Sequence, residues 1–204
     1  MTVTISSQRV DEFTDAVASD APTPGGGAVA GTVAGLGAAL VGMAGRYAQK
    51  HEPDSVLFPR LIERSDELRR RSSALADADA DAYAHYLQVS RSVVEKEARR
   101  TAIRAALEEA AAVPYELGVL AAEIADAGEQ LATSGYPGLR SDACAAALLA
   151  SAVAASAAIL VQVNLGSSPD DPRIADSAQH ARDAMASADR AVAAHNSVQK
   201  RVTT

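Results

Sequence analysis

The sequence predicts an all-α protein, a bundle of about six helices. Of its 204 residues, 48% are hydrophobic, 3% are aromatic and none is tryptophan, and alanine supplies most of the apolar share. Alanine favours helices because it loses no side-chain entropy on ordering. No stretch shows the polar–apolar alternation of a half-buried strand, and no hairpin turn is evident. Length and composition fit one globular domain spanning residues 1–204.

Breaks rich in proline, glycine or short polar residues divide the chain into the predicted helices. The breaks are Pro22–Gly27, Gly135–Gly138 and Ser167–Pro172. Pro114 is expected to interrupt or kink the fourth helix, because proline lacks an N–H and its ring clashes with the preceding turn. Ser141 is the expected N-cap of the fifth helix. In chain order, the predicted helices are Ser7–Ser19, Gly27–Gln49, a segment from Pro53 to Val94, Glu95–Ala127, Ser141–Asn164 and Arg173–Gln199.

The third predicted helix has the clearest periodicity. Residues seven apart, with a second set four positions later, form one stripe, because seven residues nearly complete two helical turns. Asp79 lies inside this stripe, and a carboxylate facing a core is costly unless it is hydrogen-bonded, paired or protonated. Asp79 is therefore either a structural cap or inter-helix hydrogen-bond residue, or a catalytic or ligand-binding one. The stripe consists of Leu61, Ser65, Leu68, Ser72, Leu75, Asp79, Ala82, Tyr86, Val89 and Val93.

Glycines mark the start of the second predicted helix. Gly27, Gly31 and Gly35 share one helix face, where another backbone can approach closely. The segment Gly25–Ala30 formally fits a dinucleotide-binding fingerprint, but that motif requires a preceding strand, which is not predicted. A glycine-rich turn opening a helix still exposes backbone N–H groups that can bind an anion or a carbonyl oxygen.

Charge and composition argue against several classes of function. A net charge of −7 disfavours general nucleic-acid binding, which needs a basic surface. Cys144, the single cysteine, permits no internal disulfide, and its apolar neighbours predict an inert core thiol. Asp77 to Asp81 look like the start of a calcium loop, but Ala82 and Gln88 stand where that loop needs glycine and glutamate. No metal site is predicted, since the histidines are scattered.

Two uncharged stretches, Ala28–Gly45 and Ala143–Leu165, reach the length of a membrane span. They consist mainly of small residues and lack the leucine, isoleucine and phenylalanine density that lipid insertion favours. Burial in a bundle or at a subunit interface explains them better. Residues Met1 to Asp11 show no secretory signal, so a cytoplasmic location is expected.

Several segments, in this order, resemble the cyclodeaminase/cyclohydrolase family, which includes methenyltetrahydrofolate cyclohydrolases and the C-terminal domain of formiminotransferase-cyclodeaminase. Pro22–Gly27, followed by a small-residue helix ending near Met43, is similar to the family's opening signature and is the most specific part. The resemblance spans nearly the whole chain. The other similar segments are Asp79-Ala80-Asp81-Ala82-Tyr83, Glu95-Lys96 with Arg99, Ala102 and Ile103, Val113-Pro114, Ser141-Asp142, and Val161 through Asn164-Leu165.

The resemblance implies a homodimer that uses a tetrahydrofolate derivative as substrate, without a metal or nicotinamide cofactor. The implied reaction is hydrolysis of 5,10-methenyltetrahydrofolate to 10-formyltetrahydrofolate. It is preferred over cyclodeamination because these 204 residues include no formiminotransferase domain. Three alternatives stay open: a cyclodeaminase releasing ammonia from 5-formiminotetrahydrofolate, a diverged paralogue acting on another cyclic amidine or amine, and a non-catalytic helical binding or oligomerisation protein.

The implied chemistry assigns roles to particular residues. A methenyl carbon in an amidinium cation is already electrophilic, so a positioned water and a proton acceptor suffice. Of the two expected catalytic residues, Asp79 would orient that water or contact the cation. Asp142, near a helix N-terminus that favours its ionised form, would bind pterin N–H groups. Backbone amides of the glycine turn would hold a carbonyl or carboxylate, and basic side chains the glutamate tail. The expected substrate-binding residues are Pro24, Gly25, Gly26, Gly27, Tyr83, Ser141 and Asn164, with Arg46, Lys50, Lys96 and Arg99 for the tail.

The chain departs from the family pattern at polar positions. The family usually has serine where this chain has Ala28, and asparagine where it has Tyr136 and Leu160. Gly138 stands in place of a second asparagine, whereas Asn164 is kept. Loss of polar groups near a pocket would alter the substrate or abolish the activity.

Overall fold

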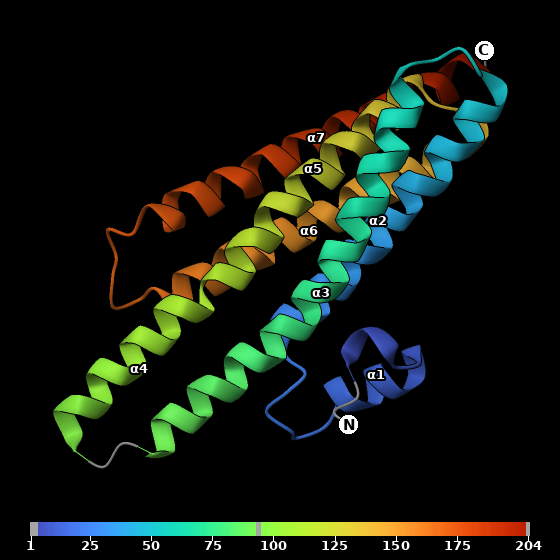
Figure 1. The fold of residues 1–204 in the computed structure, drawn as a ribbon. Coiled ribbons are helices and arrows are strands. Elements are labelled where there is room, and N and C mark those ends of the chain that lie inside the picture. The colour runs from blue at the N-terminus through green and yellow to red at the C-terminus, as the bar shows by residue number, and fades with distance from the viewer. Residues whose placement is uncertain (1–3, 93–94, 203–204) are drawn as a thin grey trace.

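The computed structural model describes residues 4–92 and 95–202, and over these residues the protein is helical with no strand (Figure 1). The predicted all-α fold is confirmed. The elements in chain order are η1 (Ile5–Ser7), α1 (Val10–Val17), α2 (Gly26–His51), α3 (Leu57–Ser92), α4 (Lys96–Ala110), α5 (Ala112–Ser134), η2 (Pro137–Leu139), α6 (Arg140–Asn164) and α7 (Pro172–Val202), where η marks a short 3-10 helix.

Five long helices, α2, α3, α5, α6 and α7, run side by side and form an elongated bundle (Figure 1). The core lies between them and is built mainly of alanine, with larger side chains such as Leu117, Leu120 and Ile124 from α5. The distal half of α3 and all of α4 form a hairpin that projects beyond the other helices, while α1 lies to one side (Figure 1). This arrangement leaves the hairpin facing the start of α2 and the end of α6.

The glycine face of α2 allows the close approach to α3 that its spacing predicts. A Cβ added at Gly31 would lie 2.9 Å from both the backbone nitrogen and the Cβ of Ala76, closer than atoms can pack without movement. A Cβ at Gly35 would meet its nearest neighbour at 3.8 Å, an ordinary contact. Tight packing therefore requires glycine at position 31 but not at position 35.

The predicted interruption near Pro114 is confirmed: the fourth predicted helix breaks at Ala111, and Pro114 lies in the first turn of α5. A proline ring clashes with the carbonyl four residues earlier, and Ala110 is the residue at which α4 ends.

Two predicted boundaries are wrong. The helix after this break continues to Ser134, beyond the predicted end at Ala127. Ser141 is not an N-cap, because η2 leads directly into α6 and the helix begins one residue before it. Val94 lies outside the described residues.

The helices α2 and α6 combine a buried face with an exposed apolar one. By length and composition alone, α2 and the segment Pro137–Asn164 could cross a membrane, with 61% and 44% of their most apolar windows buried inside the bundle. Such burial is typical of the core helices of a bundle. Large apolar side chains nevertheless remain exposed on them, namely Leu36, Tyr47, Leu148, Leu149, Ile159 and Val163.

Candidate active site

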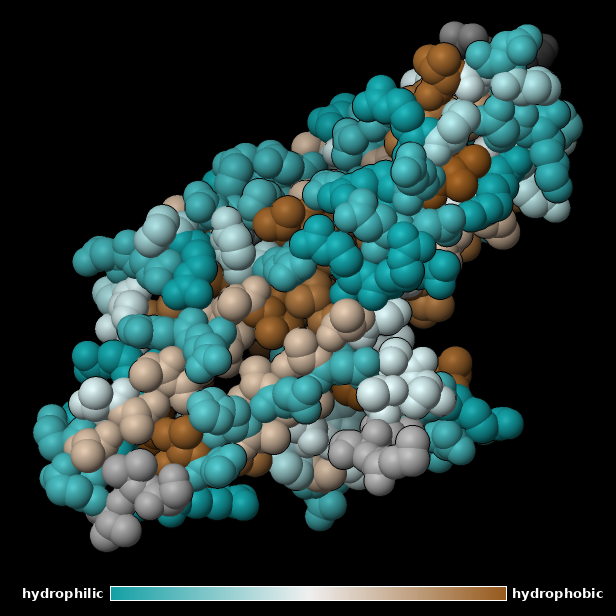
Figure 2. Space-filling model, in the orientation of Figure 1, coloured by the Kyte–Doolittle hydropathy of each residue, from teal (hydrophilic) through white to brown (hydrophobic). Residues whose placement is uncertain are grey.

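A cavity of about 490 Å³ lies where the hairpin faces the start of α2 and the end of α6. Cavities of this size hold drug-sized ligands. On the face shown in Figure 2, apolar side chains gather where α3 faces α4 and α5, and hydrophilic ones cover the outer edges. The lining residues are Pro22, Thr23, Gly25, Gly26, Gly27, Asp79, Ala82, Tyr83, Tyr86, Leu107, Ala110, Pro114, Leu160, Val163 and Asn164.

Asp79 is the acidic side chain of this cavity. It is partly buried on α3, as the heptad stripe predicts, and its Oδ2 accepts a hydrogen bond of 3.0 Å from the backbone N–H of Ala28. Burial raises the pKa of the Asp79 carboxyl, and the Ala28 hydrogen bond opposes this only in part. The inter-helix hydrogen bond predicted as one alternative for Asp79 is present, since one carboxylate oxygen joins α3 to α2. The residue also lines the cavity, where its catalytic or ligand-binding role stays a prediction.

Gly27 has no side chain because the Asp79 carboxylate occupies that space. A Cβ at Gly27 would lie 1.9 Å from Oδ1 of Asp79, which is impossible without displacing the carboxylate. Ala28, whose side chain is fully buried, contributes its backbone N–H instead. The start of α2 and the middle of α3 are therefore built around a single carboxylate position.

Gly25 and Gly26 differ from Gly27, because an added Cβ at either position meets no atom within 4 Å. Both line the cavity, at the N-terminus of α2. The first N–H groups of a helix have no partner within the helix, and the helix dipole makes this end attractive to an anion or a carbonyl oxygen. Packing within the chain gives no reason for glycine at these two positions.

The remaining walls combine Tyr83, a predicted substrate-binding residue, with residues that the sequence did not single out as site residues. The rings of Tyr83 and Tyr86 lie 5.7 Å apart on α3, and Leu107 faces them from α4. Tyr86 has a signal in the sequence, since it follows Asp79 by seven residues on the same stripe. Nothing in the sequence marks Leu107 or Ala110, whereas Val163 lies in the segment from Val161 to Leu165 that resembles the family pattern. Leu160, one of the departures from the family pattern, lines the cavity close to Asn164.

The other predicted site residues lie elsewhere in the chain. Ser141 and Asp142 begin α6, whereas Asn164 ends it, and 22 residues of helix span roughly 33 Å. Pro24 lines a neighbouring apolar groove between α1, α2 and α6. Lys96 and Arg99 start α4, toward the hairpin tip and away from Leu107.

Arg46 and Lys50 lie near the C-terminus of α2, at the end of the bundle opposite the cavity. Nη2 of Arg46 lies 2.5 Å from Oδ2 of Asp66, and Nζ of Lys50 lies 5.3 Å from the ring centroid of Tyr47. At the same end, the Tyr136 and His51 rings stack with centroids 4.1 Å apart. A single chain thus brings together Asp79, the three glycines, Tyr83 and Asn164, but not Asp142 and the basic candidates.

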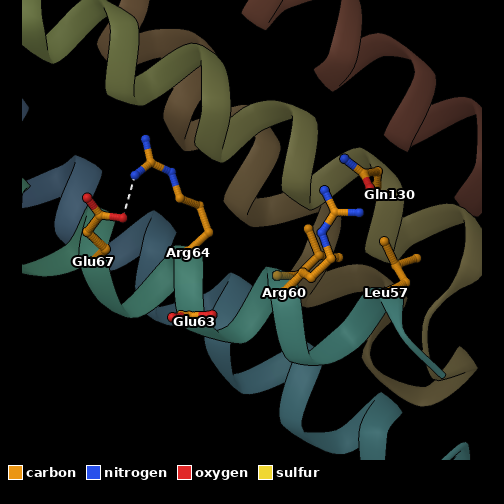
Figure 3. Close-up of a pocket in the computed structure, with 7 residues that line it drawn as sticks. Leu57, Arg60, Glu63, Arg64, Glu67 and Gln130 are labelled. Atoms are coloured by element: carbon orange, nitrogen blue, oxygen red, sulfur yellow. Dashed lines mark hydrogen bonds and ion pairs between the residues drawn. The ribbon is translucent and has the colours of Figure 1, made fainter. Parts of the chain in front are cut away.

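A second cavity of about 390 Å³ lies between α3 and α5 (Figure 3). Its lining residues are Leu57, Arg60, Leu61, Glu63, Arg64 and Glu67 of α3 and Gln130 of α5. Arg64 donates to Glu67 at 2.5 Å and to Glu123 at 2.7 Å, so its charge is balanced within the protein. Exposed pairs of this kind are ordinary surface features. The first cavity, with its partly buried carboxylate, is the stronger candidate site.

Metal ligands are not clustered in either place. Over residues 4–92 and 95–202, no group of three or more His, Cys, Asp or Glu side chains is arranged to hold a metal ion. Cys144 is buried, and burial raises the pKa of its thiol, as expected for an inert core residue.

Comparison with known proteins identifies relatives over most of the chain. The profile of the formiminotransferase-cyclodeaminase family matches residues 9–184. A methenyltetrahydrofolate cyclohydrolase from Methylorubrum extorquens is 33% identical over 165 residues, which is 78% of this chain and 79% of that protein. A formimidoyltransferase-cyclodeaminase from Sus scrofa is 32% identical over 166 residues, 78% of this chain but only 31% of that longer protein.

A solved structure agrees with these relatives. The crystal structure of a formiminotetrahydrofolate cyclodeaminase from Thermotoga maritima superposes with a TM-score of 0.77 at 26% identity, covering 97% of this chain and 98% of that one. The folate enzymes to which the sequence motifs point are therefore its relatives in sequence and in fold. The chain belongs to the formiminotransferase-cyclodeaminase family.

Proposed function

We propose that the protein is a methenyltetrahydrofolate cyclohydrolase, which adds water to 5,10-methenyltetrahydrofolate and yields 10-formyltetrahydrofolate and a proton. The observation that carries this proposal is Asp79, a partly buried carboxylate with a raised pKa in a cavity of about 490 Å³. The cyclohydrolase relative, whose length the match covers to 79%, supports it. The folate is the substrate, and the proposed reaction uses no further cofactor.

The cavity offers what the reaction needs. The substrate carries a positive charge on the amidinium that includes the methenyl carbon, and the ionised Asp79 attracts this charge while accepting a proton from the attacking water. Tyr83, Tyr86 and Leu107 provide flat and apolar walls for the folate rings. The start of α2, at Gly25 and Gly26, provides N–H groups for a carbonyl or carboxylate oxygen.

The decisive experiment follows the absorbance of the methenyl form with purified protein, with Asp79→Asn and with no enzyme. The wild type should accelerate the loss of absorbance, and the variant should lose on the order of a hundredfold in kcat, since a positioned general base contributes about this much. Asparagine can still accept the Ala28 hydrogen bond, so the variant keeps the fold. A wild type that leaves the rate unchanged, or a fully active variant, would refute the proposal.

Cyclodeamination is the second candidate, favoured by the Thermotoga maritima structure and by the Sus scrofa relative. That reaction closes the ring of 5-formiminotetrahydrofolate and releases ammonia, so the methenyl absorbance rises instead of falling. Supplying each folate separately, with ammonia measured in parallel, distinguishes the two activities.

We also propose a homodimer that packs through the exposed apolar face of α2 and α6. Asp142 lies on this face, because Leu149, Ser156 and Val163 follow it at intervals of seven residues along α6. In a two-fold dimer centred on this face, the start of α6 in one protomer meets the end of α6 in the other. The partner's Asp142 then approaches the cavity that holds Asp79. A cytoplasmic location is proposed for this dimer.

Mixing two inactive variants tests this arrangement. Protomers carrying Asp79→Asn and protomers carrying Asp142→Asn should each be inactive alone, yet mixed dimers contain one cavity with both carboxylates. Random exchange should therefore restore about a quarter of the wild-type activity. No recovery in dimers shown to have exchanged would place the two residues in separate sites.

A further inference from the structure

The α4 wall of the cavity is held to the rest of the bundle by few packing contacts. Leu107 and Ala110 of α4 line the cavity, yet α4 packs mainly against its hairpin partner α3 and makes few contacts with α5 and α6. The opposite wall is the end of α6, with Val163 and Asn164. The width of the cavity therefore depends on how α4 is held against the segment that follows α6.

Glu108, between Leu107 and Ala110, makes the connection through both its side chain and its backbone. Its Oε1 accepts a hydrogen bond of 2.6 Å from the Ser168 hydroxyl. Its carbonyl oxygen accepts one of 3.1 Å from Nη1 of Arg173. Glu108 is partly buried, unlike its exposed neighbour Glu109.

Arg173 and Ser168, which bind Glu108, are themselves held by hydrogen bonds. Two hydrogen bonds hold the Arg173 guanidinium on Asp171: Nε donates to Oδ1 at 3.0 Å and Nη2 to Oδ2 at 2.8 Å. The backbone N–H of Ser168 donates to the carbonyl of Leu165 at 2.8 Å, next to Asn164. The loop after α6 is therefore a rigid support for Glu108.

We infer that Glu108, Ser168 and Arg173 form a clamp that sets the distance between the α4 and α6 walls, and that these three are positioning residues for substrate binding. The inference rests on the proposed function, whose cavity it concerns. The clamp touches neither Asp79 nor the glycine turn. Its loss therefore weakens binding of the substrate rings and leaves the chemical step intact, so that KM rises while kcat holds.

Two other glutamates serve as controls that distinguish positioning of the cavity wall from a general contribution to stability. Glu129 and Arg190 form an ion pair of 2.6 Å between α5 and α7, and neither lines the cavity. Removing Glu129 breaks a connection between helices far from the substrate. Removing Glu109 takes a charge from α4 without touching the clamp.

The test compares Glu108→Ala and Glu108→Gln with the controls Glu129→Ala and Glu109→Ala in the full-length enzyme. Glu108→Ala removes the hydrogen bond from Ser168 and keeps the backbone carbonyl that binds Arg173. It should raise KM roughly fivefold to tenfold with kcat within about twofold, the size expected for one lost hydrogen bond. Glu108→Gln keeps an acceptor for Ser168 and should restore a KM near that of the wild type. Glu129→Ala should lower Tm, and both controls should leave KM unchanged.

Equal KM changes in Glu108→Ala and Glu129→Ala, an unchanged KM in Glu108→Ala, or failure of Glu108→Gln to restore it would each overturn the clamp. Amide hydrogen exchange gives a readout that needs no substrate. Exchange over residues 104–110 should rise in Glu108→Ala but not in either control. If the wild type turns over no folate, the proposed function fails, and exchange alone decides whether the clamp exists.

Discussion

The two ends of the bundle differ in the partners of their charged side chains. At the end formed by Tyr136 and the C-terminus of α2, two arginines have partners within the chain: Arg46 pairs with Asp66, and Nε of Arg140 donates to the carbonyl of Ala132 at 2.7 Å. At the cavity end, Asp79 is partly buried against a single backbone N–H, and its pKa is raised.

The difference is the one expected from the proposed role of Asp79 in the active site. A partly buried carboxylate that lacks a cation partner destabilises the folded state, and such groups concentrate at active sites. An arginine paired at a surface contributes little and requires no functional explanation. Substitutions at the cavity end, with a packing position of the same helix as the control, test this difference.

The largest effect is expected from Gly27→Ala. The new methyl group would occupy the position of the Asp79 carboxylate, 1.9 Å from Oδ1, so Asp79 must rotate away and lose its Ala28 hydrogen bond. Activity should fall by on the order of a hundredfold or more, as for a misplaced general base. Steady-state kinetics on the folded variant measure this loss.

Gly31→Ala is the matched control. Its methyl group would clash with Ala76 in the same helix pair and should cost about 1–3 kcal/mol of unfolding free energy, the usual penalty for overpacking. It leaves the Asp79 carboxylate in place and should retain most of the activity at temperatures where it is folded. If both variants lost the same activity, general disruption of α2 would explain Gly27→Ala.

Asp79→Asn should stabilise the protein at neutral pH. Because burial raises the pKa of Asp79, the folded state binds a proton more tightly than the unfolded state, and wild-type stability falls as pH rises through the raised pKa. Asparagine has no charge to desolvate. The gain should be on the order of 1 kcal/mol, a modest value because solvent partly screens the carboxyl.

The pH dependence identifies the cause of this gain. Below the ordinary aspartate pKa, Asp79 is protonated in both states, so the two proteins should have nearly equal unfolding free energies. Denaturant unfolding of both proteins across this pH range measures the difference. A gain that did not shrink at low pH would mean that the substitution acts through something other than the carboxylate charge.

The sequence predicted the fold well because its signals are local. Proline and glycine breaks located the helices, and the heptad stripe placed Asp79 on the inner side of α3. Ser141 failed as a cap because a 3-10 turn starts α6 earlier than side-chain preference suggests. Local signals therefore locate elements better than their ends.

The candidate site was predicted only in part because its walls come from distant segments. Leu107 and Leu160 line the same cavity as Asp79 only because the hairpin lies against the end of α6. No periodicity in either helix predicts this arrangement. Arg46 is the opposite case. Its charge suggested that it binds the substrate, whereas in the structure it pairs with Asp66 on another helix. Pairings between helices are not visible in the sequence of either one.

The smallest effect is expected from Gly26→Ala, which tests whether the substrate occupies the open space at the start of α2. A Cβ at Gly26 meets no atom within 4 Å, so the fold tolerates it, and alanine's higher helix propensity should add at most about 1 kcal/mol of stability. The methyl group would enter space beside the cavity and should raise KM roughly threefold to tenfold, while Asp79 keeps its position and kcat changes little. Thermal unfolding and kinetics on the same preparation measure both quantities. A more stable variant with an unchanged KM would show that substrate does not approach Gly26, and the glycine turn would then matter only through Gly27 and the carboxylate beside it.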